Sequence, residues 1–102
     1  GKIVPIEIKA GDMFLLPAKV PHSPQRGPNT VGLVIERVRE GDVLDSFAWY
    51  CENCSNKLYE EFMPVNDIVN QLPPVMNAFY ADLDKRTCKK CGTVMEPPVA
   101  LK

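Results

Sequence analysis

The chain has 102 residues, 45% of them hydrophobic, and a net charge of −1. This length allows one small domain with a marginal core, which a bound metal would stabilise. The balanced charge gives no electrostatic footprint for nucleic acid or an anionic membrane, and no apolar run approaches the roughly 20 residues of a membrane span. Because the first residues also lack the layout of a signal peptide, we expect a cytoplasmic protein that binds neither membrane nor nucleic acid.

Residues 2–50 are predicted to be β-structure. Ile6 and Ile8 alternate with charged residues, as in a strand with one buried face. A proline-rich loop at 17–28 follows a short apolar run. The clearest strand pattern is 30–38, where apolar residues recur at every second position. Short strands with turn signals between them are typical of a sandwich or barrel.

Four cysteines form two identical pairs, Cys51 with Cys54 and Cys88 with Cys91. Two residues between cysteines let both sulfurs of a tight turn point at one centre, and two such turns supply four thiolates at the corners of a tetrahedron. The pattern predicts a structural zinc or rubredoxin-type iron site, and thiolate chemistry does not separate the two metals. Two disulfides in a secreted domain are the weaker alternative.

Helical material is predicted between the two cysteine pairs. Asn66 or Asp67 can cap a short helix that runs to Leu72, where Pro73-Pro74 then interrupts it. A second helix is expected to run to about Lys85, because apolar residues recur at helical spacing. This stripe indicates packing rather than a cofactor site, and it comprises Val75, Met76, Phe79, Tyr80 and Leu83.

The single histidine, His22, follows a glycine turn, an apolar run and a stiffening proline. This arrangement resembles the second cupin motif, although Lys19 stands where that motif has a glycine. A lone histidine is usually structural or at the surface, but this setting favours a metal ligand. The guanidinium of Arg26 can bind a carboxylate through two hydrogen bonds. Burying the carboxylate of Glu36 in a barrel would cost free energy unless it pairs with another group or has a role in binding or catalysis. Exposure to solvent is the alternative for both.

Taken together, these features resemble the 3-hydroxyanthranilate 3,4-dioxygenases, in the bacterial and fungal form with a rubredoxin-like cysteine site. The segments that carry the resemblance are 15–26, 30–36, 49–54 and 85–91. The resemblance implies a homodimeric, cytoplasmic oxidoreductase in which a non-haem Fe(II), held by two histidines and a glutamate, opens an aromatic ring with O₂. The small aromatic substrate would be 3-hydroxyanthranilate, on the kynurenine pathway towards quinolinate.

By this resemblance His22 matches a ligand of the catalytic iron, and Arg26 matches a residue that grips the substrate carboxylate. Glu36 matches a residue that contacts the ring substituents and moves a proton. The cysteines match a second, structural iron or zinc centre away from the chemistry. The family's other iron ligands lie upstream, whereas the 21 residues before His22 contain no histidine. We therefore expect the C-terminal portion of the enzyme, inactive by itself.

The expected fold is mostly β, with residues 1–50 as the C-terminal part of a cupin (jelly-roll) barrel. Residues 51–102 would form a small α-containing, rubredoxin-like metal-binding extension, ending in a loose or partner-bound tail at 96–102. Exposed barrel edges would favour pairing between chains, as in a homodimer. Two alternatives are a zinc-ribbon-type protein-binding module and a non-catalytic cupin. The chain lacks the basic stripe and stacking aromatic residues of a nucleic-acid-binding ribbon.

Overall fold

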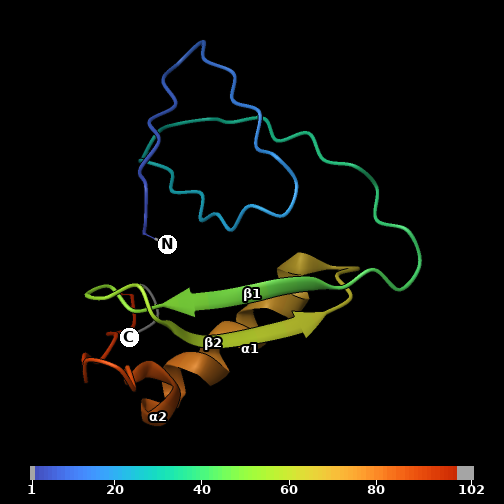
Figure 1. Cartoon of the computed structure of the whole chain (residues 1–102). Coiled ribbons are helices and arrows are strands. Elements are labelled where there is room, and N and C mark those ends of the chain that lie inside the picture. Colours follow the sequence, from blue (N-terminus) through green and yellow to red (C-terminus); the bar gives the residue numbers. More distant parts are fainter. Residues whose placement is uncertain (1, 99–102) are drawn as a thin grey trace. The chain divides into compact units, whose positions relative to one another are not determined.

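The computed structural model describes residues 2–98, and its helices and strands all lie in the second part of the chain (Figure 1). Strands β1 (Asp45–Tyr50) and β2 (Lys57–Met63) precede helices α1 (Ile68–Ala81) and α2 (Leu83–Arg86). The chain divides into two units, residues 4–38 and residues 39–98, and residues 2–3 belong with the second unit. No helix in residues 2–98 is long and apolar enough to cross a membrane.

Strands β1 and β2 form an antiparallel two-stranded sheet, with Ser46 opposite Phe62 and Trp49 opposite Tyr59. The register shifts between Trp49 and Tyr50, where the chain enters the first cysteine turn. Strand β2 was not predicted, because only helix was expected between the cysteine pairs. The adjacent acids at 60–61 hide the alternation of apolar and polar residues that would have indicated a strand.

Helix α1 begins where the sequence predicts but is not interrupted. The Asp67 side chain accepts a hydrogen bond from the backbone N–H of Asn70 at 3.3 Å, which caps the helix. The expected break at Pro73-Pro74 is wrong, since both prolines lie inside one continuous helix. Both prolines are exposed, and each lacks the N–H that would donate to the carbonyl four residues earlier. The helix ends at Ala81, and not near Lys85, because Asp82 caps α2 instead.

The core of residues 39–98 is small and sulfur-rich. Among the described residues only Phe79, Cys51 and Cys88 are buried, with exposures of 0%, 1% and 2%. Phe79 projects from α1 against Trp49 of β1 and Tyr59 of β2, with ring centroids 4.4 and 6.2 Å away. Two of the three buried side chains are thus cysteines of the metal-binding cluster, so that cluster supplies much of the buried interior.

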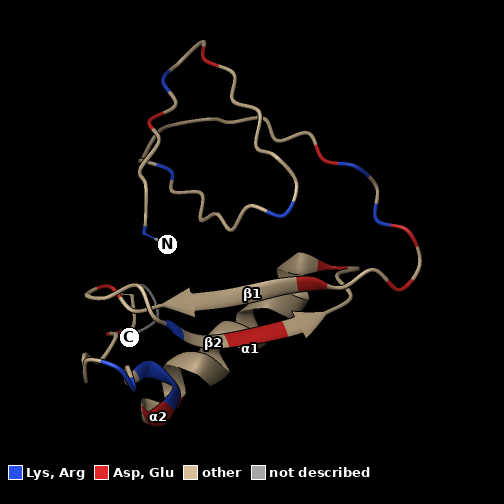
Figure 2. Cartoon of the chain, viewed as in Figure 1, with Lys and Arg blue, Asp and Glu red and all other residues tan. Residues whose placement is uncertain are grey.

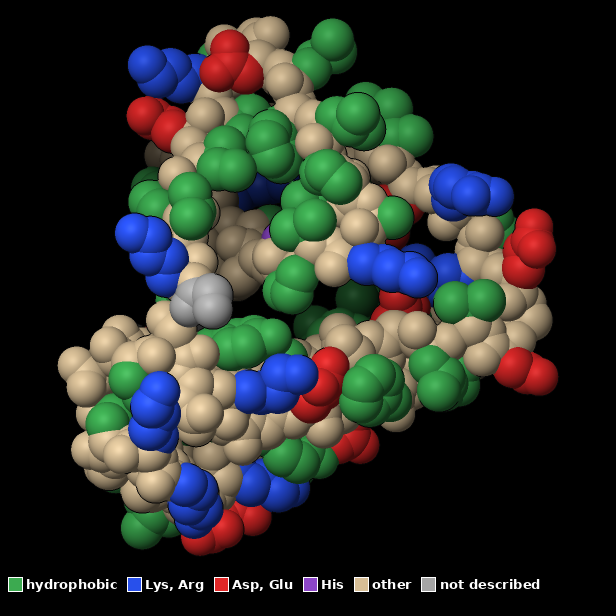
Figure 3. All heavy atoms as spheres, viewed as in Figure 1, with side chains coloured by type: hydrophobic (Ala, Val, Ile, Leu, Met, Phe, Trp, Pro, Cys, Tyr) green, Lys and Arg blue, Asp and Glu red, His purple; other side chains and the backbone are tan. Residues whose placement is uncertain are grey.

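Residues 4–38 contain no helix or strand, so the strand expected at 30–38 is not formed. Val31, Leu33 and Ile35 are 100%, 87% and 88% exposed, and hydrophobic side chains cover much of this unit in Figure 3. A strand needs a neighbour for its N–H and C=O groups, and the described residues of this unit supply none. The mostly β expectation therefore holds only for the β1–β2 pair, and no cupin barrel forms within residues 2–98.

Candidate metal centre and the histidine loop

The first cysteine turn is closed by two backbone hydrogen bonds. The N–H of Ser55 donates to the carbonyl of Cys51 at 2.9 Å, and the N–H of Cys51 donates to the carbonyl of Asn56 at 2.7 Å. Ser55 has a φ of 62°, a left-handed conformation that bends the chain back toward β2. The turn thereby aims the sulfurs of Cys51 and Cys54 to one side.

The second cysteine turn repeats the first at the same offsets. The N–H of Gly92 donates to the carbonyl of Cys88 at 2.9 Å, and the N–H of Cys88 donates to the carbonyl of Thr93 at 2.8 Å. Gly92, at φ 80°, occupies the position of Ser55. Glycine takes this conformation without strain, so the second turn is the easier one to form. The two turns are thus local copies of one hydrogen-bonded loop.

The two turns bring all four sulfurs together. Sγ of Cys51 lies 3.5 Å from Sγ of Cys91, and Sγ of Cys54 lies 3.6 Å from Sγ of Cys88. All four sulfurs lie within 4.8 Å of one another. Zn–S bonds of about 2.3 Å in a tetrahedron imply S···S separations of about 3.8 Å, so the cluster has the right size. Within residues 2–98 no other group of three or more metal-binding side chains is this close.

The alternative of two disulfides is excluded for this structure. All four cysteines are free, and the closest sulfurs are 3.5 Å apart, far beyond the roughly 2.05 Å of an S–S bond. The close approach of four thiols without a bond is the arrangement that a metal ion stabilises, because thiolates bind a cation and otherwise repel one another. The four cysteines are therefore placed to hold a metal.

The surroundings of Cys54, Cys88 and Cys91 shift the pKa values of these three thiols in different directions. Hydrogen bonds from the Thr93 and Asn53 side chains and the Thr93 backbone lower the pKa of Cys91 to about 5. The backbone N–H groups of Cys91 and Lys90 lower the pKa of Cys88. The Asn56 backbone N–H favours the thiolate of Cys54, but burial and the other three sulfurs outweigh it and raise the pKa of Cys54 to about 11. A divalent cation would replace the retained protons.

Basic residues surround the second cysteine turn, at α2 and just after it (Figure 2). Basic side chains near a metal tetrathiolate would offset its negative charge. In the structure each described basic side chain of α2 has another partner nearby. Lys85 lies over the Tyr59 ring, 4.3 Å from its centroid, and Arg86 donates to the carbonyl of Met95 at 2.9 Å. Lys85 and Arg86 therefore act on the sulfurs through long-range electrostatic attraction.

The predicted iron-site and substrate-binding residues lie in the unit of residues 4–38 and are exposed. Nδ1 of His22 lies 2.8 Å from the carbonyl oxygen of Val20. Arg26 folds over Gly32, and its Nη1 donates to the Gly32 carbonyl at 3.5 Å. No cluster of metal ligands forms around His22 within residues 2–98, so the described residues alone do not fit a catalytic iron. The role of Glu36 stays a prediction.

Lys19, which stands where the cupin motif has a glycine, has a left-handed backbone conformation. Its φ is 64°, in the left-handed region that glycine favours. The substitution made this loop conformation doubtful from sequence alone. The structure places a non-glycine residue there at some cost in strain, and the match of this loop to the cupin motif stays a prediction.

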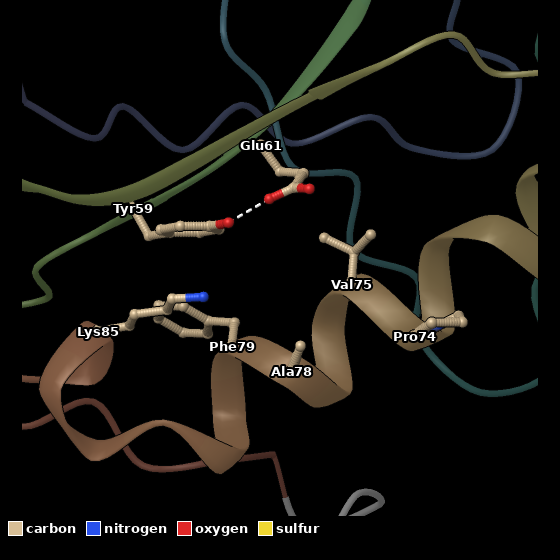
Figure 4. A pocket seen from close by; sticks show the side chains of 7 residues that line it. All are labelled: Tyr59, Glu61, Pro74, Val75, Ala78, Phe79 and Lys85. Atoms are coloured by element: carbon tan, nitrogen blue, oxygen red, sulfur yellow. Dashed lines mark hydrogen bonds between the residues drawn. The ribbon is translucent and has the colours of Figure 1, made fainter.

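A second feature of residues 39–98 is a pocket of about 330 Å³ between β2 and the helices (Figure 4). Tyr59 donates a hydrogen bond from its hydroxyl to the carboxylate of Glu61 at the rim. Lys85 covers the opposite side, and Phe79 closes the base. The remaining walls are apolar and come from α1: Pro74, Val75 and Ala78.

Comparison with known proteins identifies the family. Residues 1–80 match the family described as 3-hydroxyanthranilic acid dioxygenase. The chain is 50% identical, over 93 residues, to a 3-hydroxyanthranilate 3,4-dioxygenase of Xanthomonas euvesicatoria pv. vesicatoria (strain 85-10), covering 91% of this chain and 53% of that protein. An enzyme of the same name from Bacillus thuringiensis (strain Al Hakam) is 40% identical over 99 residues, 97% of this chain and 55% of that protein. The chain belongs to this family, as the sequence indicated.

The chain spans about half the length of the curated relatives it matches. The family assignment therefore rests on a long and close match, whereas the activity of the whole enzyme is a separate question.

Sequence analysis missed the residues that close the two turns, Asn56 and Thr93. Each lies five positions after the first cysteine of its pair, but the stretches Cys51–Asn56 and Cys88–Thr93 share only their cysteines. Because the closing hydrogen bonds use backbone carbonyls, the sequence gives no signal for them beyond this common offset. The prediction considered only the spacing of the cysteines and not the residues that follow them.

Proposed function

We propose that this chain is part of a non-haem Fe(II) dioxygenase that opens the ring of 3-hydroxyanthranilate with O₂. The observation that carries the proposal is the family match over residues 1–80, which includes His22, Arg26 and Glu36. That match does not favour the alternative of a zinc-ribbon binding module. Bound Fe(II) would supply the centre at which O₂ and substrate meet, and its remaining ligands would come from outside residues 2–98.

Within that proposal His22 is an iron ligand, and Arg26 pairs its guanidinium fork with the substrate carboxylate. Glu36 lies at the ring substituents and accepts or returns a proton. Arg26 already bends over Gly32, where an added Cβ would lie 2.6 Å from Nη2. A glycine at position 32 thus leaves room for this arginine. The partial barrel, the homodimer and the cytoplasmic setting belong to the same proposal. The four free thiols are consistent with the cytoplasmic setting, because thiols stay reduced there.

The four cysteines form a separate structural centre for iron or zinc, and it takes no part in ring opening. Its metal can be identified directly from the purified chain. Charge-transfer absorption and a red colour indicate iron, whereas a colourless protein with one zinc per chain indicates zinc.

The function is tested with the chain itself and with a chimera. The chain alone, with Fe(II) and 3-hydroxyanthranilate, is expected to show no ring cleavage, because its described residues form no iron site. In the chimera this chain replaces the matching 93 residues of the Xanthomonas euvesicatoria enzyme, and activity is expected to be kept.

Variants of the chimera then separate the proposed roles. His22→Ala should abolish turnover, Arg26→Ala should mainly raise KM, and Glu36→Gln should mainly lower kcat. Gln25→Ala is the matched control in the same loop and should leave both parameters unchanged. An inactive chimera that binds iron, or an active His22→Ala variant, would contradict the proposal.

A further inference from the structure

Asn56 contacts both cysteine turns. Its backbone carbonyl accepts the N–H of Cys51 at 2.7 Å and closes the first turn. Its side-chain Nδ2 lies 3.7 Å from Sγ of Cys88, a residue of the second turn, 32 positions further along the chain. We propose that Asn56 is a positioning residue, which holds the two turns in register and donates an N–H···S hydrogen bond to the metal-bound sulfur of Cys88. This inference rests on the proposed metal centre and not on ring cleavage.

The neighbours of the Asn56 amide fix which way it points. Nδ2 also lies 3.3 Å from the backbone carbonyl of Lys57. An amide nitrogen has two N–H bonds, so one can serve the carbonyl and the other the sulfur of Cys88. If the amide were turned over, its oxygen would face two acceptors, a carbonyl and a thiolate. The N–H orientation is therefore the one that satisfies both partners.

The corresponding residue of the second turn acts only locally. Thr93 closes its own turn through its backbone carbonyl, and its Oγ1 lies 3.2 Å from Sγ of Cys91 in the same turn. Asn53 also reaches from the first turn to Cys91, but that sulfur is exposed. Asn56 instead reaches Cys88, which is 2% exposed. A hydrogen bond to a buried thiolate is worth more, because water does not compete for the sulfur.

The expected consequence is a change in both metal affinity and sulfur charge. A tetrathiolate around a divalent ion carries two negative charges, and N–H donors draw electron density from the sulfurs. Losing the donor should weaken metal binding and shift the sulfur-to-metal charge-transfer band. In an iron-loaded chain it should also lower the reduction potential, because the reduced and more negative centre loses stabilisation.

The test uses Asn56→Asp, which keeps the shape of the side chain but points a carboxylate oxygen at the sulfur. Co(II) is the probe, with affinity measured by competition against a chelator and the charge-transfer band recorded at saturating Co(II). We expect affinity to fall about 10- to 100-fold, with a shifted band. Asn77→Asp is the matched control, since it makes the same chemical change on the exposed face of α1 and should alter neither value.

Asn56→Gln keeps an amide donor and should recover part of the affinity lost in Asn56→Asp. Wild-type affinity and an unshifted band in Asn56→Asp would overturn the proposal. Equal loss in the Asp and Gln variants, including failure of both to fold with Co(II), would also overturn it, because the amide would then not be what matters. If the unaltered chain binds no Co(II), the metal centre itself fails, which is a different result from a failure of Asn56 alone.

Discussion

The indole ring of Trp49 stacks on the phenyl ring of Phe79, with centroids 4.4 Å apart and planes inclined by 13°. Trp49 is the second residue before Cys51, at the end of β1, whereas Phe79 comes from the last turn of α1. Tyr80 packs edge-on against Phe79, with centroids 5.0 Å apart. This stack attaches the helix to the strand that leads into the metal centre, so helix packing and metal binding should stabilise each other.

Phe79→Ala should therefore destabilise the metal-loaded chain by about 3–5 kcal/mol, the usual cost of truncating a buried phenylalanine. Such a loss is a large part of the stability of a small domain, so denaturant curves of the variant are recorded at low temperature to obtain a folded baseline. Phe62→Ala is the control, because Phe62 is 60% exposed and should cost far less. Equal effects of the two substitutions on chemical denaturation would contradict the assigned core.

Metal removal should unfold the region from Trp49 to Met95 more than the rest of the chain. Two of the three buried side chains there are cysteines, so much of the binding energy is folding energy. With a chelator, trypsin should cut faster at Lys57 and Arg86. Cleavage at Lys19 should keep its rate, since residues 4–38 contain no helix or strand that depends on the metal. The same increase at all three sites would argue against a metal-dependent core.

The local parts of the structure were predictable, and the parts that depend on distant partners were not. The paired cysteines and the Asp67 cap follow from short patterns, and both are present. Strand β2 was missed because its residues do not alternate clearly between apolar and polar, and its pairing with β1 depends on residues elsewhere in the chain. The 30–38 segment has a clear strand pattern but forms no strand, since a strand pattern specifies a face and not the neighbour that must pair with it.

The loop around His22 likewise shows that a local pattern does not predict distant partners. The motif around His22 predicts a metal ligand, and Lys19 at the motif's glycine position has the left-handed backbone that glycine favours. Within residues 2–98 no second metal ligand joins the imidazole, because a local motif specifies one loop and not the distant residues that must pack beside it. The four cysteine ligands could be predicted, since each turn contributes two of them and the chain contains both turns, whereas the residues that close the turns could not.

The stability of residues 39–98 should fall at alkaline pH through Tyr59. Its hydrogen bond to Glu61 and partial burial raise the pKa of Tyr59, against the opposing effect of Lys85. A raised pKa means that folding favours the neutral phenol. The stabilisation is therefore complete below the unfolded pKa of about 10 and is lost as the pH rises through the higher folded value.

This pH dependence can be measured by ultraviolet titration of tyrosinate in the metal-loaded chain. Glu61→Gln should lower the pKa of Tyr59 toward its ordinary value, and Tyr59→Phe identifies which titration belongs to that residue. The unaltered chain and Glu61→Gln should differ in stability at neutral pH and converge in strong alkali. An unchanged titration of Tyr59 in Glu61→Gln would show that the hydrogen bond does not set its pKa.

Pro73→Ala should stabilise the chain. Pro73 lies inside α1 and has no backbone N–H, so it cannot donate the helical hydrogen bond to the carbonyl of Val69. Proline costs about 3 kcal/mol relative to alanine inside a helix, and part of this is offset because proline also restricts the unfolded chain. We expect a net gain of about 1–3 kcal/mol in denaturant unfolding, with more helical circular dichroism. Asn77→Ala, an exposed change in the same helix, should gain less than about 1 kcal/mol. A loss of stability in Pro73→Ala would mean that the proline ring itself packs in a way that the helix needs.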